Sequence, residues 1–369
     1  MAGSATTRSF NPNIHGLRGF AALMVFVYHV YLVGLGTQTW PANWPQWLSW
    51  IGAVGCYGVE LFFMISGYLI TETLTRKHSV GQFLIDRSIR LHPAFLGVIV
   101  PMFAVGMLFR LEMFADTPPW SWPLHFVSNA LFLPGVFELP SILPVAWTLS
   151  FELAFYLTAA GAFLIARRGQ QPAAFALCIA VGFLLFPRAP GVVFFFIGAC
   201  LYLYRDRLLG ALARLHLPGL CLLLFLALWH IVTEDYHRTR ADLSVVFALA
   251  ILGSAFSGLL LFNSITQGIG WLPAVMRTRV MQFLGTISYS FYLWHAVVMY
   301  PVKHGLMARL LPQVGASMTL LIFTVISLIG SVVISWLSYR ILEVGVGNWL
   351  RKRLARARPT SLSPTAPTG

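Results

Sequence analysis

The sequence predicts an all-α membrane protein, a polytopic bundle of about ten transmembrane helices. Of its 369 residues, 58% are hydrophobic and only 10% are charged, which is far from the balance of soluble domains. Apolar runs long enough to cross a bilayer core of about 30 Å recur along the whole chain. We expect spans at residues 14–34, 56–71, 93–111, 145–166, 172–187, 191–204, 217–232, 243–263, 280–301 and 317–339.

Two of these runs are weaker than the others. Residues 172–187 and 191–204 are short, and a stretch bearing Pro187, Pro190 and Gly191 separates them. Proline and glycine interrupt regular structure, so a re-entrant pair is the alternative to two tilted spans. That alternative would change the count of spans by two.

The basic residues predict which ends of the spans face the cytoplasm. Of the 25 Lys and Arg, 19 fall on one side of the predicted bundle and six on the other. The positive-inside rule therefore assigns both termini to the cytoplasm. The first run carries Arg18 and His29 and has no cleavage site after it, so we expect it to remain as a span. Residues 1–350 are expected to form a single transmembrane domain, and residues 351–369 a basic, then disordered, cytoplasmic tail.

Charge and cysteine content exclude several other classes. The net charge of +13 comes from short basic runs between apolar stretches, not from one patch, so we expect no nucleic-acid partner. The four cysteines show no CxxC spacing, so we expect neither a disulfide framework nor a metal site. The remaining partners are membrane lipids and a ligand of the bundle.

Ionisable residues inside predicted spans are the first candidates for a functional site, because such groups are costly in a bilayer. Arg18 and His29 are 11 positions apart, so on a helix they share a face about 16 Å apart. Counted from their span ends, His29, Glu60, Glu152 and His295 all fall in the outer half of the bilayer. A packed, hydrogen-bonded histidine is as frequent as a functional one.

A second cluster lies at the cytoplasmic side. Arg87 and Arg90 precede the run that starts at Pro93 and, at spacing i and i+3, would share a helix face suited to a phosphate-bearing ligand. The more common role of such a pair is a positive-inside anchor. An outer polar cluster above an inner arginine cluster indicates either a long bipolar ligand or a conduit, so an enzyme and a transporter both remain open.

Other polar and aromatic residues have two interpretations each. Ser288, Tyr292 and His295 share one helix face and are either ligand contacts or interhelical hydrogen-bonding residues. His230 is expected at the membrane interface, and Glu343 on a solvated or lipid-facing surface. The tryptophans of the outer loops form either an interfacial aromatic belt or a stacking platform for a sugar ring; they are Trp40, Trp44, Trp47, Trp50, Trp120 and Trp122.

Five segments in order resemble the acyltransferase 3 family of membrane acyltransferases. The first is GLRGFAA at 16–22 followed by Tyr28 and His29, which gives the Arg-x10-His signature of the family. The others are GVELFFMISGYLI at 58–70, RSIRLHP at 87–93, WTLSFELAFY at 147–156 and LGTISYSFYLWH at 284–295. The resemblance runs from about residue 10 to about residue 350, although residues 170–270 contribute only hydropathy.

The resemblance implies a stand-alone O-acyltransferase similar to exopolysaccharide and lipopolysaccharide O-acetyltransferases of the bacterial inner membrane. The implied donor is cytoplasmic acyl-CoA, most simply acetyl-CoA, and the implied acceptor is a glycan or lipid-linked oligosaccharide; a homo-oligomer is compatible with it. A polysaccharide transporter or flippase, an inactive assembly subunit and a macrolide-like acceptor are the alternatives. Direct transfer and a covalent acyl-histidine both stay open.

The same resemblance assigns roles to individual residues. His29 is expected to be the general base, with Glu152 or Glu60 orienting its imidazole. Arg87 and Arg90 would hold the phosphates of the donor, whose pantetheine arm would pass Arg18. The acceptor would contact four further side chains, which are Ser288, Tyr292, His295 and Trp147.

Overall fold

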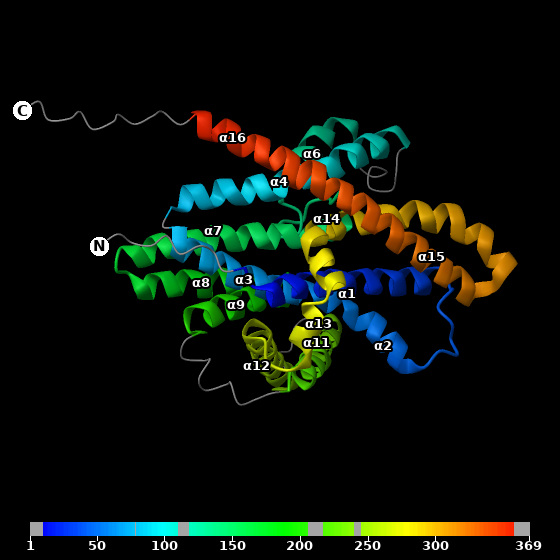
Figure 1. The fold of residues 1–369 in the computed structure, drawn as a ribbon, viewed down its shortest axis with the longest axis horizontal. Coiled ribbons are helices and arrows are strands. Elements are labelled where there is room, and N and C mark those ends of the chain that lie inside the picture. The colour runs from blue at the N-terminus through cyan, green and yellow to red at the C-terminus, as the bar shows by residue number, and fades with distance from the viewer. Residues whose placement is uncertain (1–9, 78, 110–117, 206–216, 240–244, 358–369) are drawn as a thin grey trace, which may run out of the picture.

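In a computed structural model the chain is a helical bundle, and the part described comprises residues 10–77, 79–109, 118–205, 217–239 and 245–357 (Figure 1). Within these ranges there are helices and turns but no β-strand. The all-α fold class predicted from the sequence is therefore confirmed. The predicted tail after Arg351 is helical up to Ala357, and residues 358–369 lie outside the described residues.

Each of the ten predicted apolar runs falls on a helix. Apolar side chains at nearly every position allow a helix to satisfy its own backbone while facing lipid or its neighbours. In chain order these helices are α1 (Pro12–Gly36), α3 (Gly58–Lys77), α4 (Val80–Phe109), α7 (Trp147–Arg167), α8 (Gln171–Leu185), α9 (Val193–Leu203), α11 (Pro218–Thr239), α12 (Val245–Gln267), α14 (Arg279–Val302) and α15 (Ala308–Ser338).

The start of α4 differs from the prediction. The helix begins at Val80, 13 residues before the predicted start at Pro93, and continues through Pro93 and Pro101. A proline removes one intrahelical hydrogen bond, but helices packed in a membrane bundle tolerate this loss. Arg87 and Arg90 consequently lie inside the helix, on its first three turns. Residues 110 and 111 of the predicted run, and 243 and 244 of another, lie outside the described residues.

Shorter helices join these long ones. They are α2 (Gln46–Val54), α6 (Trp122–Ala130), α13 (Trp271–Met276) and α16 (Gly347–Ala357), with a π-helical segment, η6 (Tyr339–Val346), between α15 and α16. α2 lies in the tryptophan-rich segment after α1, where Trp40 donates a hydrogen bond to Ser49 (2.9 Å) and packs edge-on against Tyr31 and Trp44. Trp40 and Trp44 thus form part of the packing at the end of α1.

Six helices of the described chain are long and apolar enough to cross a membrane, and α8, α9 and the first part of α11 are apolar but shorter. One of the six is the continuous run Arg279–Arg356, inside which Gly315 (φ 75°) breaks the helical geometry. α14 and α15 also pack against each other, which requires the chain to change direction between them. The count of ten spans and the cytoplasmic assignment of the termini stay predictions.

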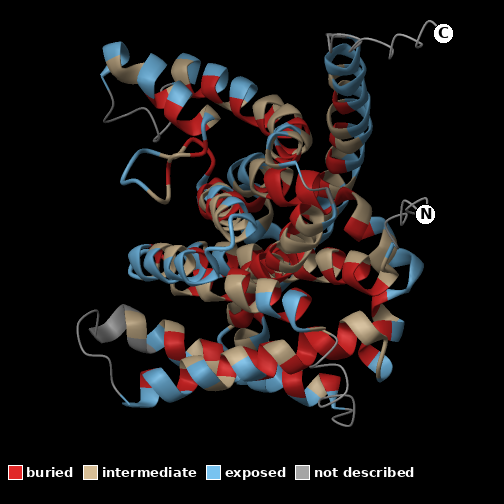
Figure 2. Cartoon of the chain, turned by 90° about the vertical axis from the view of Figure 1, so that its left-hand side faces the viewer, coloured by how far each residue is buried: buried red, intermediate tan, exposed pale blue. Residues whose placement is uncertain are grey.

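The core gathers around α1, which packs mainly against α14 and α3. Buried residues concentrate where the helices face one another, and exposed residues cover the outer faces (Figure 2). α1 and α14 approach closely at Gly19 and Gly285. A Cβ on Gly19 would lie only 2.7 Å from the backbone nitrogen of Gly285, so this crossing requires glycine there. Small residues at a crossing allow such approach of membrane helices. The crossing brings the later turns of α1 beside those of α14.

Candidate functional site

Three cavities adjoin one another along α1, and we name them by their contents. The basic cavity, of about 590 Å³, is near the start of α1 and is lined by Phe10, Asn11, Ile14, His15, Arg18, Tyr68, Leu69, Glu72, Arg90, Gly285, Thr286, Tyr339 and Glu343. The histidine cavity, of about 620 Å³, is near the other end of α1, and His29, Glu60, Trp147 and His230 are in its wall. The small central cavity, of about 70 Å³, lies between them.

Shared side chains show that the cavities are in series. Arg18, Leu69 and Arg90 line both the basic and the central cavity. Val59, Phe63 and Tyr292 line both the central and the histidine cavity. A ligand that entered the basic cavity would therefore meet two guanidiniums first, then a narrow segment, and then the space in front of His29.

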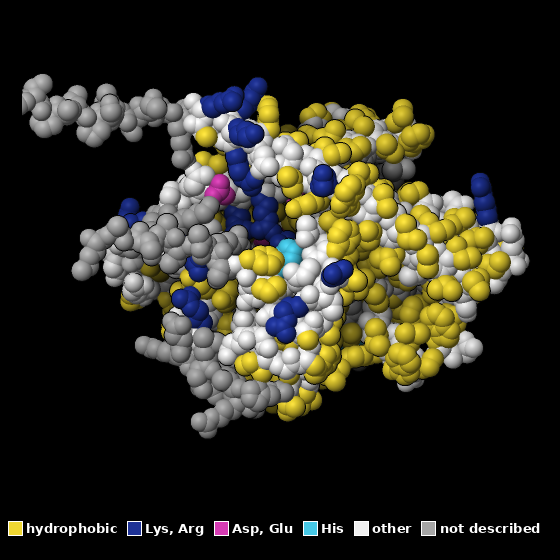
Figure 3. Space-filling model, in the orientation of Figure 1, with side chains coloured by type: hydrophobic (Ala, Val, Ile, Leu, Met, Phe, Trp, Pro, Cys, Tyr) yellow, Lys and Arg dark blue, Asp and Glu magenta, His cyan; other side chains and the backbone are white. Residues whose placement is uncertain are grey.

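The arginine cluster is built from α1 and α4. Arg87 is buried; it donates a hydrogen bond to Thr73 (3.2 Å), and its guanidinium lies 5.5 Å from the ring centroid of Phe83. It reaches only the central cavity, whereas Arg18 and Arg90 reach both. Guanidiniums bind phosphate through paired N–H donors. In Figure 3, Lys and Arg side chains gather in a hollow of the surface beside a histidine.

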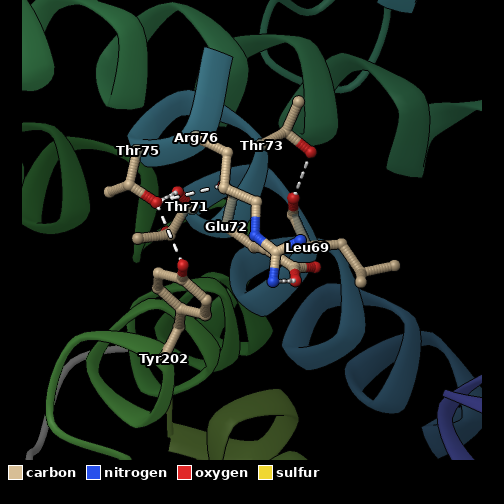
Figure 4. A network of polar contacts seen from close by, with 7 residues as sticks. All are labelled: Leu69, Thr71, Glu72, Thr73, Thr75, Arg76 and Tyr202. Atoms are coloured by element: carbon tan, nitrogen blue, oxygen red, sulfur yellow. Dashed lines mark hydrogen bonds and ion pairs between the residues drawn. The ribbon is translucent and has the colours of Figure 1, made fainter. Parts of the chain in front are cut away.

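The carboxylates around the basic cavity have different partners. Glu72, on the last turns of α3, forms an ion pair with Arg76 (3.1 Å), and nearby threonines donate hydrogen bonds to carbonyls of their own helix (Figure 4). Glu343 accepts a hydrogen bond from Ser290 (2.6 Å) instead. It lines the basic cavity, so its prediction as a solvated or lipid-facing residue was wrong.

His29 is held by α1 and α14 together. Its Nδ1 lies 2.8 Å from the carbonyl oxygen of Val25 and 3.3 Å from Nε2 of His295, and the two rings meet edge to face at 4.8 Å. A carbonyl can only accept, so Nδ1 of neutral His29 carries the proton. The same reasoning applies to His295, whose Nδ1 lies 3.0 Å from the carbonyl of Phe291. His29 is therefore left with an unprotonated Nε2 for a ligand in the histidine cavity.

Neither predicted carboxylate partner contacts Nδ1 of His29 among the described residues. Glu152 is in the central cavity with the arginines, where Ser66 (3.0 Å) and Tyr156 (2.6 Å) donate hydrogen bonds to it. Glu60 lines the same cavity as His29, yet the polar contacts of Nδ1 among the described residues are to Val25 and His295. The prediction that Glu60 and Glu152 share a bilayer depth with His29 rested on counting along spans, which does not give the direction in which a side chain points.

Ser288, Tyr292 and His295 share one face of α14, but they do not all line a cavity. Ser288 and Tyr292 line the central cavity, and the Tyr292 hydroxyl donates to the carbonyl of Val145 (2.7 Å) at the junction with the histidine cavity. His295 is 1% exposed and lies behind His29, outside the linings of all three cavities. Trp147, 37% exposed, contributes an aromatic wall to the histidine cavity.

Sequence reasoning missed other residues of the histidine cavity. His230 was expected at the interface, but it hydrogen-bonds through Nδ1 to the Tyr57 hydroxyl (2.9 Å) in the wall of this cavity. Arg188 lies there too. The lining is rich in rings, with Tyr28, Tyr31, Tyr57, Trp147, Trp229 and Tyr236. Faces of aromatic rings beside polar groups suit a ligand that presents both C–H surfaces and hydroxyl groups.

The sequence is similar to that of known membrane acyltransferases. The family model described as an acyltransferase domain matches residues 11–340. The chain is 25% identical over 340 residues to the peptidoglycan O-acetyltransferase OatA of Listeria monocytogenes, covering 80% of this chain and 50% of the relative. It is 27% identical over 268 residues to the exopolysaccharide production protein ExoZ of Rhizobium meliloti, covering 66% of this chain and 76% of that relative.

A third relative, nodulation protein 10 of Rhizobium leguminosarum, is 29% identical over 188 residues, which cover 46% of this chain and 48% of the relative. The chain thus spans about half the length of OatA and of nodulation protein 10. No solved structure matches it.

Proposed function

Because the chain belongs to the acyltransferase 3 family, whose model matches residues 11–340, we propose that it is a membrane O-acyltransferase. It moves an acyl group, most simply acetyl, from cytoplasmic acyl-CoA to a hydroxyl group of a cell-surface or exported glycan in a bacterial inner membrane. The observation that carries this proposal is the series of cavities with shared walls between Arg90 and His29.

The donor occupies the basic and central cavities. Its phosphates bind Arg18 and Arg90, with Arg87 adding positive charge in the central cavity. The pantetheine arm is thin enough for the narrow central segment, and the thioester passes Val59, Phe63 and Tyr292 to reach His29. The acceptor, free or lipid-linked, enters the histidine cavity, where Trp147 provides a ring face for a sugar.

The reaction follows from the tautomer of His29. Its free Nε2 removes the proton from the acceptor hydroxyl while that oxygen attacks the thioester carbonyl carbon. The carbon–sulfur bond then breaks, and the CoA thiolate takes the proton from His29. The products are an ester and CoA-SH. An acyl group carried briefly on Nε2 of His29 is the two-step variant of the same chemistry.

Two neighbouring groups support His29. Nε2 of His295 and the carbonyl of Val25 both accept from the Nδ1–H of His29 and so hold the ring while Nε2 of His29 gains and loses its proton. Glu60, in the same cavity, stabilises the imidazolium by its negative charge. Glu152 acts at the other end of the path, because its hydrogen bonds to Ser66 and Tyr156 fix a carboxylate beside the arginines.

The proposed activity is tested with the purified protein and radiolabelled acetyl-CoA. Candidate acceptors are lipid-linked oligosaccharides, extracted exopolysaccharide, lipopolysaccharide and peptidoglycan. We expect label to appear as an ester on one class of glycan, with release of one CoA for each ester formed. A transporter would move glycan across proteoliposome membranes without consuming acetyl-CoA, and this result in the absence of any ester product would overturn the proposal.

A further inference from the structure

Glu343 is a charged residue of the basic cavity that the mechanism above does not use. It belongs to η6, the π-helical segment between α15 and α16, and lines the cavity together with Arg18 and Arg90. π-Helical turns are rare in proteins, and those that do occur are frequently found at functional sites. A carboxylate at the place where phosphates are expected to bind requires an explanation, because it repels them.

A short hydrogen-bonded chain holds the Glu343 side chain in place. Ser290 of α14 donates to one carboxylate oxygen at 2.6 Å, and the hydroxyls of Ser290 and Ser338 lie 3.0 Å apart. Ser290 is fully buried and Ser338 is 5% exposed. The Ser290 hydroxyl is the donor in both contacts, so its single proton is shared between Glu343 and Ser338, with the shorter contact to Glu343. The chain fixes one oxygen, Oε1, and leaves Oε2 without a hydrogen-bond partner among the residues that the structure describes.

The charges that line the basic cavity show how Glu343 changes its preference for ligands. Glu72 is neutralised by Arg76, so the groups that face a ligand are Arg18 and Arg90 against Glu343. Neither arginine forms an ion pair with Glu343 within the described residues, so a ligand group has room between them. With the carboxylate, the cavity is selective for a ligand that brings both an anion and a hydrogen-bond donor.

We propose that Glu343 determines donor specificity by accepting, at its free oxygen, a hydrogen bond from an amino or hydroxyl group of acyl-CoA while the arginines bind a phosphate. It also disfavours free polyanions, because its negative charge repels them. This inference rests on the proposed function, since acyl-CoA must be the donor. The chemistry is shared by the adenosine amino and hydroxyl groups and by the hydroxyl of the pantetheine arm.

The test compares Glu343→Gln with the wild-type protein. Glutamine keeps an oxygen for Ser290 but presents an N–H donor to the cavity, so it reverses the hydrogen bond that the ligand meets. Dissociation constants are measured for CoA and for inorganic pyrophosphate. We expect the dissociation constant for CoA, divided by that for pyrophosphate, to rise at least about tenfold in the variant. The reason is that CoA loses a hydrogen bond to a charged group.

Controls separate the possible outcomes. Glu138→Gln, an exposed carboxylate outside the three cavities, should leave the ratio unchanged. Ser290→Ala, which frees the Glu343 side chain without altering charge, should raise the ratio by a smaller factor. If Glu343→Gln changes both constants by the same factor, or changes neither, the proposal is overturned. If the wild-type protein binds no CoA, the failure lies with the proposed function instead.

A third probe, 4′-phosphopantetheine, identifies the group that donates. It carries the hydroxyl of the pantetheine arm but no adenosine. If Glu343→Gln weakens its binding relative to pyrophosphate as much as that of CoA, the hydroxyl is the partner of Glu343. If the effect is confined to CoA, the partner is in the adenosine part. Either result supports a hydrogen bond from the donor to Glu343.

Discussion

Replacing His29 by Gln lowers the rate constant for acyl transfer at least about 100-fold, since a general base contributes about 10²- to 10⁴-fold. Glutamine is close to histidine in size and preserves packing against His295, but its amide cannot take a proton at neutral pH. The loss follows equally if His29 carries the acyl group. Initial rates of ester formation at saturating acetyl-CoA measure it.

The same variant should still bind the donor. Arg18 and Arg90 lie in another cavity from His29, so the dissociation constant for CoA is expected to stay within about twofold of the wild-type value. His304→Gln, an exposed position outside the three cavities on the π-helical segment Lys303–Met307 that follows α14, is the matched control and should transfer at the wild-type rate. Wild-type turnover by His29→Gln would refute the role of His29.

Removing Arg18 and Arg90 together is expected to raise the dissociation constant for CoA more than any other substitution proposed outside the histidine cavity. A hydrogen bond to a charged group contributes about 1.5–3 kcal/mol, so each arginine is expected to account for about 10- to 100-fold in the dissociation constant for CoA. Calorimetric titration of CoA into the detergent-purified Arg18→Ala, Arg90→Ala double variant measures the loss.

Lysine at both positions keeps the charge but not the paired N–H donors, and should give an intermediate affinity. The double lysine variant also controls for misfolding of the double alanine variant, because its side chains fill the space of the guanidiniums. Arg188→Ala removes an arginine from the histidine cavity and should leave CoA binding unchanged. Unaltered affinity in the double alanine variant would contradict the assignment of the basic cavity to the donor.

The fold was predictable from hydropathy because a bilayer leaves few choices. Each apolar run falls on a helix, since the backbone must satisfy its own hydrogen bonds in lipid. α4 begins before the predicted span because its first turns carry polar residues that hydropathy leaves out, and the helix passes through Pro93. Spacing also predicted that Arg87 and Arg90 share a face, and both line the central cavity.

Most of the predicted site residues line the three cavities, but His295 does not, and the residues are grouped differently from the prediction. Counting along spans predicted Glu152 at the depth of His29, whereas its hydrogen bonds to Ser66 and Tyr156 place it in the central cavity with the arginines, away from His29. Helical periodicity could not locate Glu343, because η6 is a π-helix and turns the side chain differently from an α-helix of the same sequence. The contact between His29 and His295 depends on the crossing of α1 and α14, which hydropathy does not encode.

The central claim, that the thioester end of the donor reaches His29 through the basic and central cavities, is tested most directly with bromoacetyl-CoA. An imidazole nitrogen near the acyl group displaces bromide and becomes alkylated, and mass spectrometry of peptides locates the product. The Cys56→Ala variant is used, since the Cys56 thiol lines the histidine cavity and would compete. We predict that His29 is alkylated, and that excess CoA or the loss of Arg18 and Arg90 suppresses the reaction. An unmodified His29 in a variant that still transfers acetyl groups would contradict the account.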